Sequence, residues 1–233
     1  MLGWIRYGEA EVPRIERRRF GDAAVLAVCV PRCRGVRGVF AARRAASFLA
    51  RQRVRLAVFP AHYPYTDIFR RGGIDAPDVT RLHLGCASQI ALLALHRRGV
   101  AAENANIALV SEAVCGELHS AAYSLARAVR YLTLRTPDAE ALARALRREY
   151  GVAAKVLRQN DAVRADFALS FDAAAEGCTA LADERLEVSY RAVLGGEECT
   201  DAPLLAALLS AGALRARDIR AERLILPAAA NFP

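Results

Sequence analysis

Residues 106 to 172 alternate between apolar runs and helical spacing, and this alternation constrains the fold more than any other feature of the sequence. Ile107 to Val110 is a short apolar run that predicts a buried strand. Gly116 to Val129 places apolar residues three and four positions apart, as one face of a helix does. Arg130 to Arg135 then alternates like a second strand. A strand, a helix and a strand in this order predict parallel strands joined by right-handed crossovers.

The same alternation continues toward residue 172. Thr136-Pro137-Asp138 predicts the start of another helix, with Thr136 as N-cap and Pro137 at the first helical position. Val152 to Leu157 and Asp166 to Phe171 are two further strand-like runs. The sequence therefore predicts an α/β fold, with a Rossmann-like, mostly parallel sheet that carries helices on both faces.

A smaller α/β unit is expected in the N-terminal half. Ala23 to Val30 is a nearly continuous apolar run and predicts a strand covered on both faces. An amphipathic helix is predicted from Val36 to Gln52 and a second strand from Val54 to Phe59. Residues 1 to 22 are charged and predict irregular structure, apart from one short strand near Trp4 to Tyr7.

The predicted helix of the N-terminal half has Val39, Phe40, Phe48 and Leu49 on its apolar side. We expect two domains, residues 1–104 and 105–233, because the connection between the two alternating regions lies just before residue 105.

Composition excludes several classes of protein. The chain has 233 residues, of which 54% are hydrophobic, so it can form a sizeable core and is not disordered. The net charge is +8, but Lys155 is the only lysine. Together with the abundant alanine, this arginine usage indicates a GC-rich genome rather than a surface for nucleic acid, which we do not expect as a partner.

No apolar run is long enough to cross a membrane, and the N-terminus lacks the apolar region of a signal peptide. The six cysteines contain no C-x-x-C pair, which argues against a zinc ribbon and a thioredoxin-type pair. We therefore expect a cytoplasmic protein with reduced thiols. The expected partner is a small molecule or nucleotide, and homo-oligomerisation is left open.

The turn after the strand that ends at Val110 has the spacing of a dinucleotide phosphate loop. In G-x-G-x-x-G the glycines allow a tight turn, close approach to pyrophosphate and close packing of helix on strand. Here the spacing reads Ser111-x-Ala113-x-x-Gly116, so two glycines are replaced by other small residues. The Cβ of Ala113 would stand where the backbone approaches phosphate. The turn is therefore either a drifted pyrophosphate site or a vestigial one.

Arg135 and Thr136 end the second predicted strand, where an NAD-binding unit usually carries an acidic residue for the ribose hydroxyls. An arginine at this place can instead accept the 2′-phosphate of NADP. A solvated arginine at a strand end is the alternative interpretation.

At this point the sequence resembles a known group of proteins. Leu134-Arg135-Thr136 with the following Ala139-x-x-Leu142-Ala143 is similar to the Asn-Arg-Thr segment and next helix in the NADP domains of shikimate dehydrogenase and glutamyl-tRNA reductase. The segment from Ala165 to Ser170 resembles the Ala-Asp strand that comes later in those domains. The likeness covers roughly residues 107–172. It implies a degenerate member of the Rossmann-like NAD(P)-binding superfamily.

The departures from that pattern limit what the resemblance implies. Leu134 replaces the asparagine, and the lysine–aspartate pair of shikimate dehydrogenase has no counterpart before residue 105. Cys29, Cys33 and Cys86 lie in no motif that matches the catalytic cysteine of the reductase. The resemblance therefore implies an NADP-binding fold at Ser111, Ala113, Gly116, Arg135 and Thr136, and it implies no substrate.

One other loop carries candidate chemistry. His62, Tyr65 and Asp67 follow a predicted strand and could orient a substrate or act as acid and base, whereas a polar loop without chemistry is the alternative. No histidine shares a metal-ligand spacing with an acidic or cysteine partner, so no metal site is expected.

Two functions follow as hypotheses. The first is a Rossmann-like protein that binds NADP(H) and has a reductase-type activity. The second is a degenerate, non-catalytic relative that serves as a binding or assembly protein, because the sequence provides no catalytic pair.

Overall fold

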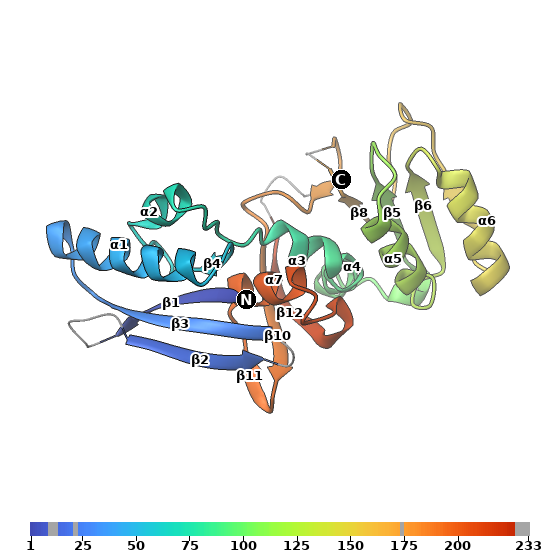
Figure 1. Ribbon diagram of the computed structural model, residues 1–233. Helices are drawn as coiled ribbons and strands as arrows, with labels where there is room; N and C mark the ends of the chain where they lie inside the picture. Colours follow the sequence, from blue (N-terminus) through green and yellow to red (C-terminus); the bar gives the residue numbers. More distant parts are fainter. Residues whose placement is uncertain (9–13, 21–22, 173–174, 227–233) are drawn as a thin grey trace. The chain divides into compact units, whose positions relative to one another are not determined.

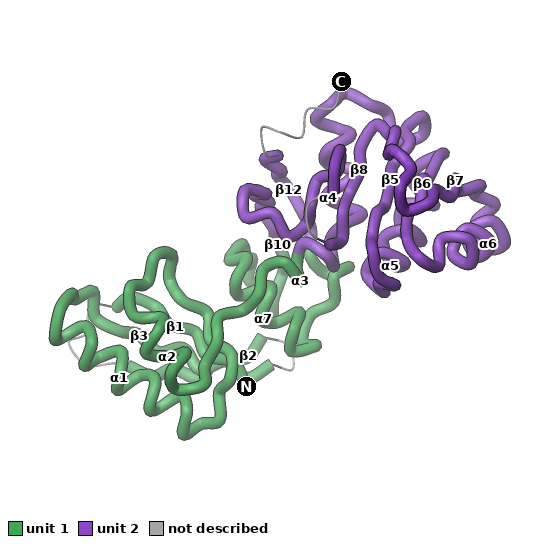
Figure 2. Tube along the Cα trace, turned by 90° about the horizontal axis from the view of Figure 1, so that it is seen from above, with its two compact units in different colours: residues 1–82, 192–219 green, residues 83–191, 220–233 purple. Residues whose placement is uncertain are grey.

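The computed structural model describes residues 1–8, 14–20, 23–172 and 175–226, and the chain divides into two compact units (Figure 2). The first unit consists of residues 1–82 and 192–219. The second consists of residues 83–191 and 220–233. Residues 192–219 thus belong to the first unit although they follow most of the second unit along the chain. The expected domain boundary between residues 104 and 105 stays a prediction.

The second unit is built on a five-stranded sheet in which every neighbouring pair of strands is parallel. The order is β7-β6-β5-β8-β9, and β6, β5 and β8 stand side by side in Figure 1. The strands are β5 (Asn106–Val110), β6 (Tyr131–Arg135), β7 (Ala154–Val156), β8 (Phe167–Ser170) and β9 (Thr179–Ala180). This parallel sheet, flanked by helices, confirms the predicted Rossmann-like fold class.

The chain moves outward from the middle of this sheet and then returns. It runs from β5 to β6 and β7, and it then crosses to β8 on the other side of β5. Ile107 to Val110 are all nearly inaccessible because this central strand is covered on both faces. The carboxyl ends of β5 and β8 therefore form the topological switch point, where open α/β sheets bind their ligands.

Helix α5 (Gly116–Leu125) connects β5 to β6, and α6 (Ala139–Tyr150) connects β6 to β7. The predicted N-cap of α6 is wrong by two residues, because Asp138 and not Thr136 precedes the first helical residue. The Thr136 hydroxyl donates to the Asp138 carboxylate at 3.0 Å, so the two side chains bond to each other rather than to the helix. At the other end, Gly151 adopts φ +70°, which L side chains disfavour, and ends α6 as glycine commonly does.

The first unit contains a mixed four-stranded sheet in the order β2-β3-β1-β4. β1 is parallel to β3 and to β4, whereas β2 is antiparallel to β3. The strands are β1 (Leu2–Gly8), β2 (Arg14–Phe20), β3 (Ala23–Pro31) and β4 (Ala57–Val58). The strand expected near Trp4 to Tyr7 lies within β1, whereas the prediction of irregular structure is wrong for Arg14–Phe20, and residues 9–13 and 21–22 lie outside the described residues. β2 is a charged edge strand, and charge is how natural sheets protect an edge, so it lacks the apolar pattern of a buried strand.

Helix α1 (Gly35–Arg51) buries small side chains together with Leu49, and this differs from the prediction. Phe40 is 71% exposed, so its assignment to the buried side is wrong. The buried face contains Gly38, where an added Cβ would lie 2.5 Å from the backbone oxygen of Cys33 and 2.1 Å from Tyr65 Oη. The helix therefore approaches its neighbours along a face of glycine and alanine, which a hydrophobicity pattern does not predict.

A short helix, α2 (Thr66–Arg71), packs on the same unit through Phe69, which is fully buried. The Phe69 ring lies 5.0 Å from the ring of Phe59 and 6.0 Å from that of Tyr63, both in edge-to-face arrangements. This aromatic cluster supports the loop that the sequence predicts to be polar and irregular.

The remaining elements lie outside these two sheets. A three-stranded sheet has the order β11-β10-β12, and Gly195 and Gly196, both at positive φ, form the turn between β10 and β11. These elements are α3 (Thr80–Gly85), α4 (Ala87–Arg97), β10 (Glu187–Leu194), β11 (Glu197–Cys199), α7 (Ala202–Ser210), β12 (Ile219–Ile225) and two single turns of 3-10 helix (Ala102–Asn104 and Ala216–Asp218). Within the described ranges, no helix is long and apolar enough to span a bilayer.

Cys86, directly before α4, makes the stability of the protein decrease as the pH rises in the alkaline range. Its side chain is fully buried, and burial raises the pKa of the thiol from 9.0 to about 12. The unfolded chain therefore releases this proton above pH 9 while the folded chain keeps it, so stability falls with rising pH in this window. One thiol contributes at most about 1.4 kcal/mol per pH unit.

We expect Cys86→Ala to show a shallower loss of stability than the wild type between pH 9 and 10. Urea unfolding at several pH values in this range measures the two slopes. The tyrosines and the other cysteines are common to both proteins, so their ionisation cancels in the comparison. Equal slopes in the two proteins would contradict the burial of an uncharged thiol at this position.

Candidate functional site

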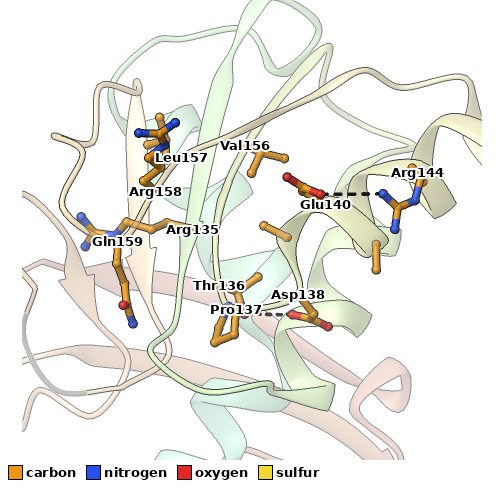
Figure 3. Close-up of a pocket in the computed structure, with 12 residues that line it drawn as sticks. Arg135, Thr136, Pro137, Asp138, Glu140, Arg144, Val156, Leu157, Arg158 and Gln159 are labelled. Atoms are coloured by element: carbon orange, nitrogen blue, oxygen red, sulfur yellow. Dashed lines mark hydrogen bonds and ion pairs between the residues drawn. The ribbon is translucent and has the colours of Figure 1, made fainter.

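The predicted cofactor residues follow the carboxyl ends of β5 and β6, at one edge of the parallel sheet. A pocket of about 610 Å³ lies at this edge, between the end of β6, the end of β7 and the start of α6. Its polar lining consists mainly of Arg135, Thr136, Asp138, Glu140, Arg144 and Arg158 (Figure 3). Two of the predicted residues, Arg135 and Thr136, therefore belong to the pocket, whereas Ser111, Ala113 and Gly116 do not line it.

Two arginines of the pocket carry positive charge without a carboxylate partner among the described residues. Arg135 donates from Nη1 to the backbone oxygen of Asp161 at 3.0 Å, which holds the side chain but does not neutralise it. The backbone of Arg158 donates to the Asp161 carboxylate at 2.8 Å, so a tight turn presents this second guanidinium after β7. Figure 3 shows both arginines beside the ends of the strands.

The acidic side chains of the pocket are already engaged. Glu140 lies 3.8 Å from Arg144 on the exposed side of α6. Asp138 accepts the hydroxyl of Thr136, and its other oxygen lies 2.7 Å from Nε2 of His119. Arg144 therefore compensates Glu140, and Asp138 is hydrogen-bonded to Thr136, while Arg135 and Arg158 have no carboxylate partner among the described residues.

The turn from Ser111 to Gly116 has its own internal partners. Ser111 is buried and donates from its hydroxyl to the backbone oxygen of Ala113 at 2.8 Å. The backbone N–H of Glu112 donates to the carboxylate of Asp172, which follows β8. A carboxylate of the protein thus accepts from the turn at the switch point, where a bound pyrophosphate would need such donors.

Gly116 does not serve the packing role that the third glycine of the motif usually has. An added Cβ at this position would meet no atom within 4 Å. The helix therefore leaves the strand without the close contact for which the motif uses glycine. The turn still consists of small residues, but close packing does not require a glycine at position 116.

Cys115, the N-cap residue of α5, is not an activated thiol. Burial raises the pKa of its thiol, and the carboxylate of Glu117, 3.4 Å from the sulfur, raises it further. The backbone N–H groups of Glu117 and Leu118 only partly offset these effects. A cysteine nucleophile needs the opposite balance.

The surroundings of His83, in the second unit, indicate a structural role. His83 is buried, with Nδ1 3.0 Å from the backbone oxygen of Leu181 and its ring stacked on Tyr190 at 5.9 Å. In the part of the chain that the structure describes, no three His, Cys, Asp or Glu side chains are grouped so that they could hold a metal ion.

A second pocket, of about 560 Å³, lies in the first unit. It brings together two of the residues predicted there, His62 and Tyr65, with Arg32 and Arg34 from the turn after β3. Asp67 does not line this pocket. Its side chain is exposed and lies 3.3 Å from Arg70 on the same short helix. The arginines were missed in the sequence, although two arginines directly after a buried strand are a recognisable signal for a ligand edge.

Comparison with known proteins gives only distant likenesses. No protein-family model matches the chain, and no curated protein is similar to it in sequence. Among solved structures, L-tryptophan dehydrogenase from Nostoc punctiforme is 11% identical over 64% of this chain, with a TM-score of 0.31, and the chain spans 44% of its length. Quinate dehydrogenase from Corynebacterium glutamicum, solved in complex with NAD, is 15% identical over 73% of this chain and 70% of its own, with a TM-score of 0.29. At these TM-scores the likenesses carry no functional argument.

Proposed function

We propose that the second unit binds NADP(H), with the 2′-phosphate held by Arg135 and Arg158. The pocket at the ends of β6 and β7 supports this proposal, because two guanidinium groups without carboxylate partners among the described residues line it. Guanidinium groups bind phosphate oxygens through paired, charge-assisted hydrogen bonds. The position also agrees with the place of the adenosine ribose in Rossmann-like sheets, at the end of the second strand.

The lining of the pocket fits the rest of an adenosine. Val156 is 39% exposed and lies beside the buried Leu157, so the end of β7 offers an apolar surface next to the arginines. A flat base needs such a surface, while its phosphate needs charge. When bound, NADPH supplies a hydride, so a reductase-type activity is the enzymatic form of this proposal.

A thermal-shift titration with NADPH, NADP, NADH and inorganic polyphosphate tests the proposal. A ligand at 100 times its dissociation constant stabilises the native state by about 2.7 kcal/mol, which gives a clear shift. We expect NADPH and NADP to produce a larger shift than NADH at the same concentration. An equal shift with polyphosphate would show that the protein responds to negative charge alone. No shift with any ligand would contradict the proposed nucleotide site.

The alternative is a non-catalytic protein that keeps the fold, and one observation favours it. The carboxylate of Asp172 accepts the backbone N–H of Glu112 in the phosphate turn. A negative charge at this position repels pyrophosphate and occupies a donor that it would use. A nucleotide would then bind through its 2′-phosphate end, without the turn that places the nicotinamide for chemistry.

We expect Asp172→Asn to raise the affinity for NADPH about ten-fold. The asparagine oxygen can still accept the hydrogen bond of the turn, whereas the repulsive charge is gone; ten-fold corresponds to about 1.4 kcal/mol. Isothermal titration measures the change. Glu197→Gln removes one negative charge on β11, in the other unit, and serves as the control. Unchanged affinity in Asp172→Asn would show that this carboxylate does not oppose nucleotide binding.

A further inference from the structure

We propose that the first unit binds a small organic anion, one that bears a carboxylate or phosphate group, in the pocket between the turn after β3 and the loop after β4. The pocket measures about 560 Å³, and Tyr7, Arg32, Cys33, Arg34, His62 and Tyr65 line it. This site is separate from the nucleotide site of the second unit and does not depend on it.

The topology brings these residues to one edge. β1, β3 and β4 are parallel, so their carboxyl ends lie on the same side of the sheet. Tyr7 stands near the end of β1, Arg32 and Arg34 follow β3, and His62 and Tyr65 follow β4. The edge beyond the carboxyl ends of parallel strands is where such sheets place their ligands.

The chemistry of the lining selects an anion. Two guanidinium groups line a pocket that has no carboxylate among the described residues of its lining. In the described structure neither Arg32 nor Arg34 forms an ion pair, and Arg32 lies 5.2 Å above the ring of Tyr7. Asp67, two residues after Tyr65, lies against Arg70 instead. Among the described residues the two guanidinium groups therefore have no carboxylate partner, and such groups bind carboxylate and phosphate oxygens through paired hydrogen bonds.

The walls of the pocket are held in place from behind. Tyr65 donates from its hydroxyl to the backbone oxygen of Cys33 at 3.3 Å, which ties the loop after β4 to the turn that carries the arginines. Tyr63 is buried and packs on both tyrosines, with its ring 5.9 Å from Tyr7 and 5.6 Å from Tyr65. A binding site needs this kind of support from residues that do not touch the ligand.

The backbone of His62 adds a separate observation. This residue adopts φ +56°, a backbone conformation that is uncommon for residues other than glycine. Residues held in such conformations cluster at ligand sites, because the surrounding structure maintains a strain that an ordinary loop would release. His62 follows Ala61 in an exposed turn, and its side chain reaches the pocket.

Isothermal titration of the full chain with inorganic phosphate, citrate and the neutral sugar glucose tests the site. We expect saturable binding of phosphate or citrate and none of glucose, with the tighter anion identifying the preferred group. Arg32→Gln and Arg34→Gln should each weaken binding about ten-fold, since each removes a charge-assisted contact. Arg44→Gln, which changes an exposed arginine of α1 that does not line the pocket, should not.

Two further comparisons keep the result specific to this pocket. Arg135→Gln removes the arginine of the other unit, so unchanged anion affinity in that variant places the anion in the first unit. Melting temperatures of the ligand-free variants confirm that each one folds. Equal weakening in Arg32→Gln and Arg44→Gln would indicate non-specific charge and overturn the proposal, as would loss of binding in Arg135→Gln alone or no saturable binding in the wild type.

Discussion

Replacing Phe69 with alanine lowers the free energy of unfolding by about 3–5 kcal/mol, the range for removing a buried phenylalanine ring. Phe69 is fully inaccessible and packs edge-to-face against Phe59 and Tyr63. Its loss leaves a cavity beneath α2 and withdraws support from the loop that carries His62 and Tyr65. Urea unfolding followed by circular dichroism measures the change.

Phe40→Ala is the matched control. This ring is 71% exposed on α1, so its removal exposes little new surface, and we expect a change within about 0.5 kcal/mol. Equal losses in the two variants would mean that the aromatic cluster around Phe69 does not form the core of the first unit.

Arg135→Glu weakens NADPH binding about 100-fold and leaves NADH binding unchanged. The substitution removes a charge-assisted contact to the 2′-phosphate and places a like charge beside it, which together cost about 3 kcal/mol. NADH has no 2′-phosphate and therefore loses nothing at this position. Fluorescence titration with the two reduced cofactors measures both affinities.

Arg147→Glu provides the control on the neighbouring helix. It changes the net charge of the protein by the same amount, but Arg147 is exposed on α6 and does not line the pocket. If both variants lost NADPH affinity equally, the effect would come from the overall field and not from a contact at Arg135.

Much of the second unit could be predicted from its sequence because its strands are buried on both faces. Ile107 to Val110 form a continuous apolar run, and a helix of regular spacing follows it, so pattern and structure agree. The first unit was harder to predict. β2 contains four arginines and a glutamate among its seven residues, so its sequence lacks the pattern of a strand. It is a strand because it pairs with β3, and a search of local sequence patterns does not detect that pairing.

The side of α1 that is buried could not be predicted because small residues determine it. Gly38, Ala42 and Ala45 allow close approach to the rest of the unit, whereas Phe40, the larger apolar residue, faces outward. A hydrophobicity pattern predicts that large apolar side chains are buried, but close packing between backbones requires small side chains at the contact.

Some residues of the candidate site could be predicted from the sequence and others could not. Arg135 and Thr136 could be found by their place at the end of a predicted strand. Asp172 could not, because it meets the backbone of Glu112 across 60 positions of sequence. Arg158 was missed for a related reason: it lies in the turn after β7 and reaches the pocket only because β7 lies beside β6.

The most direct test uses a fragment of the cofactor. Isothermal titration with 2′,5′-ADP and with 5′-AMP separates the 2′-phosphate contact from the phosphate turn that Asp172 occupies. The predicted result is one-site binding of 2′,5′-ADP at least ten-fold tighter than that of 5′-AMP, with the difference lost in Arg135→Glu. Equal affinities in the wild type, or a preference that survives Arg135→Glu, would contradict a 2′-phosphate site at the end of β6.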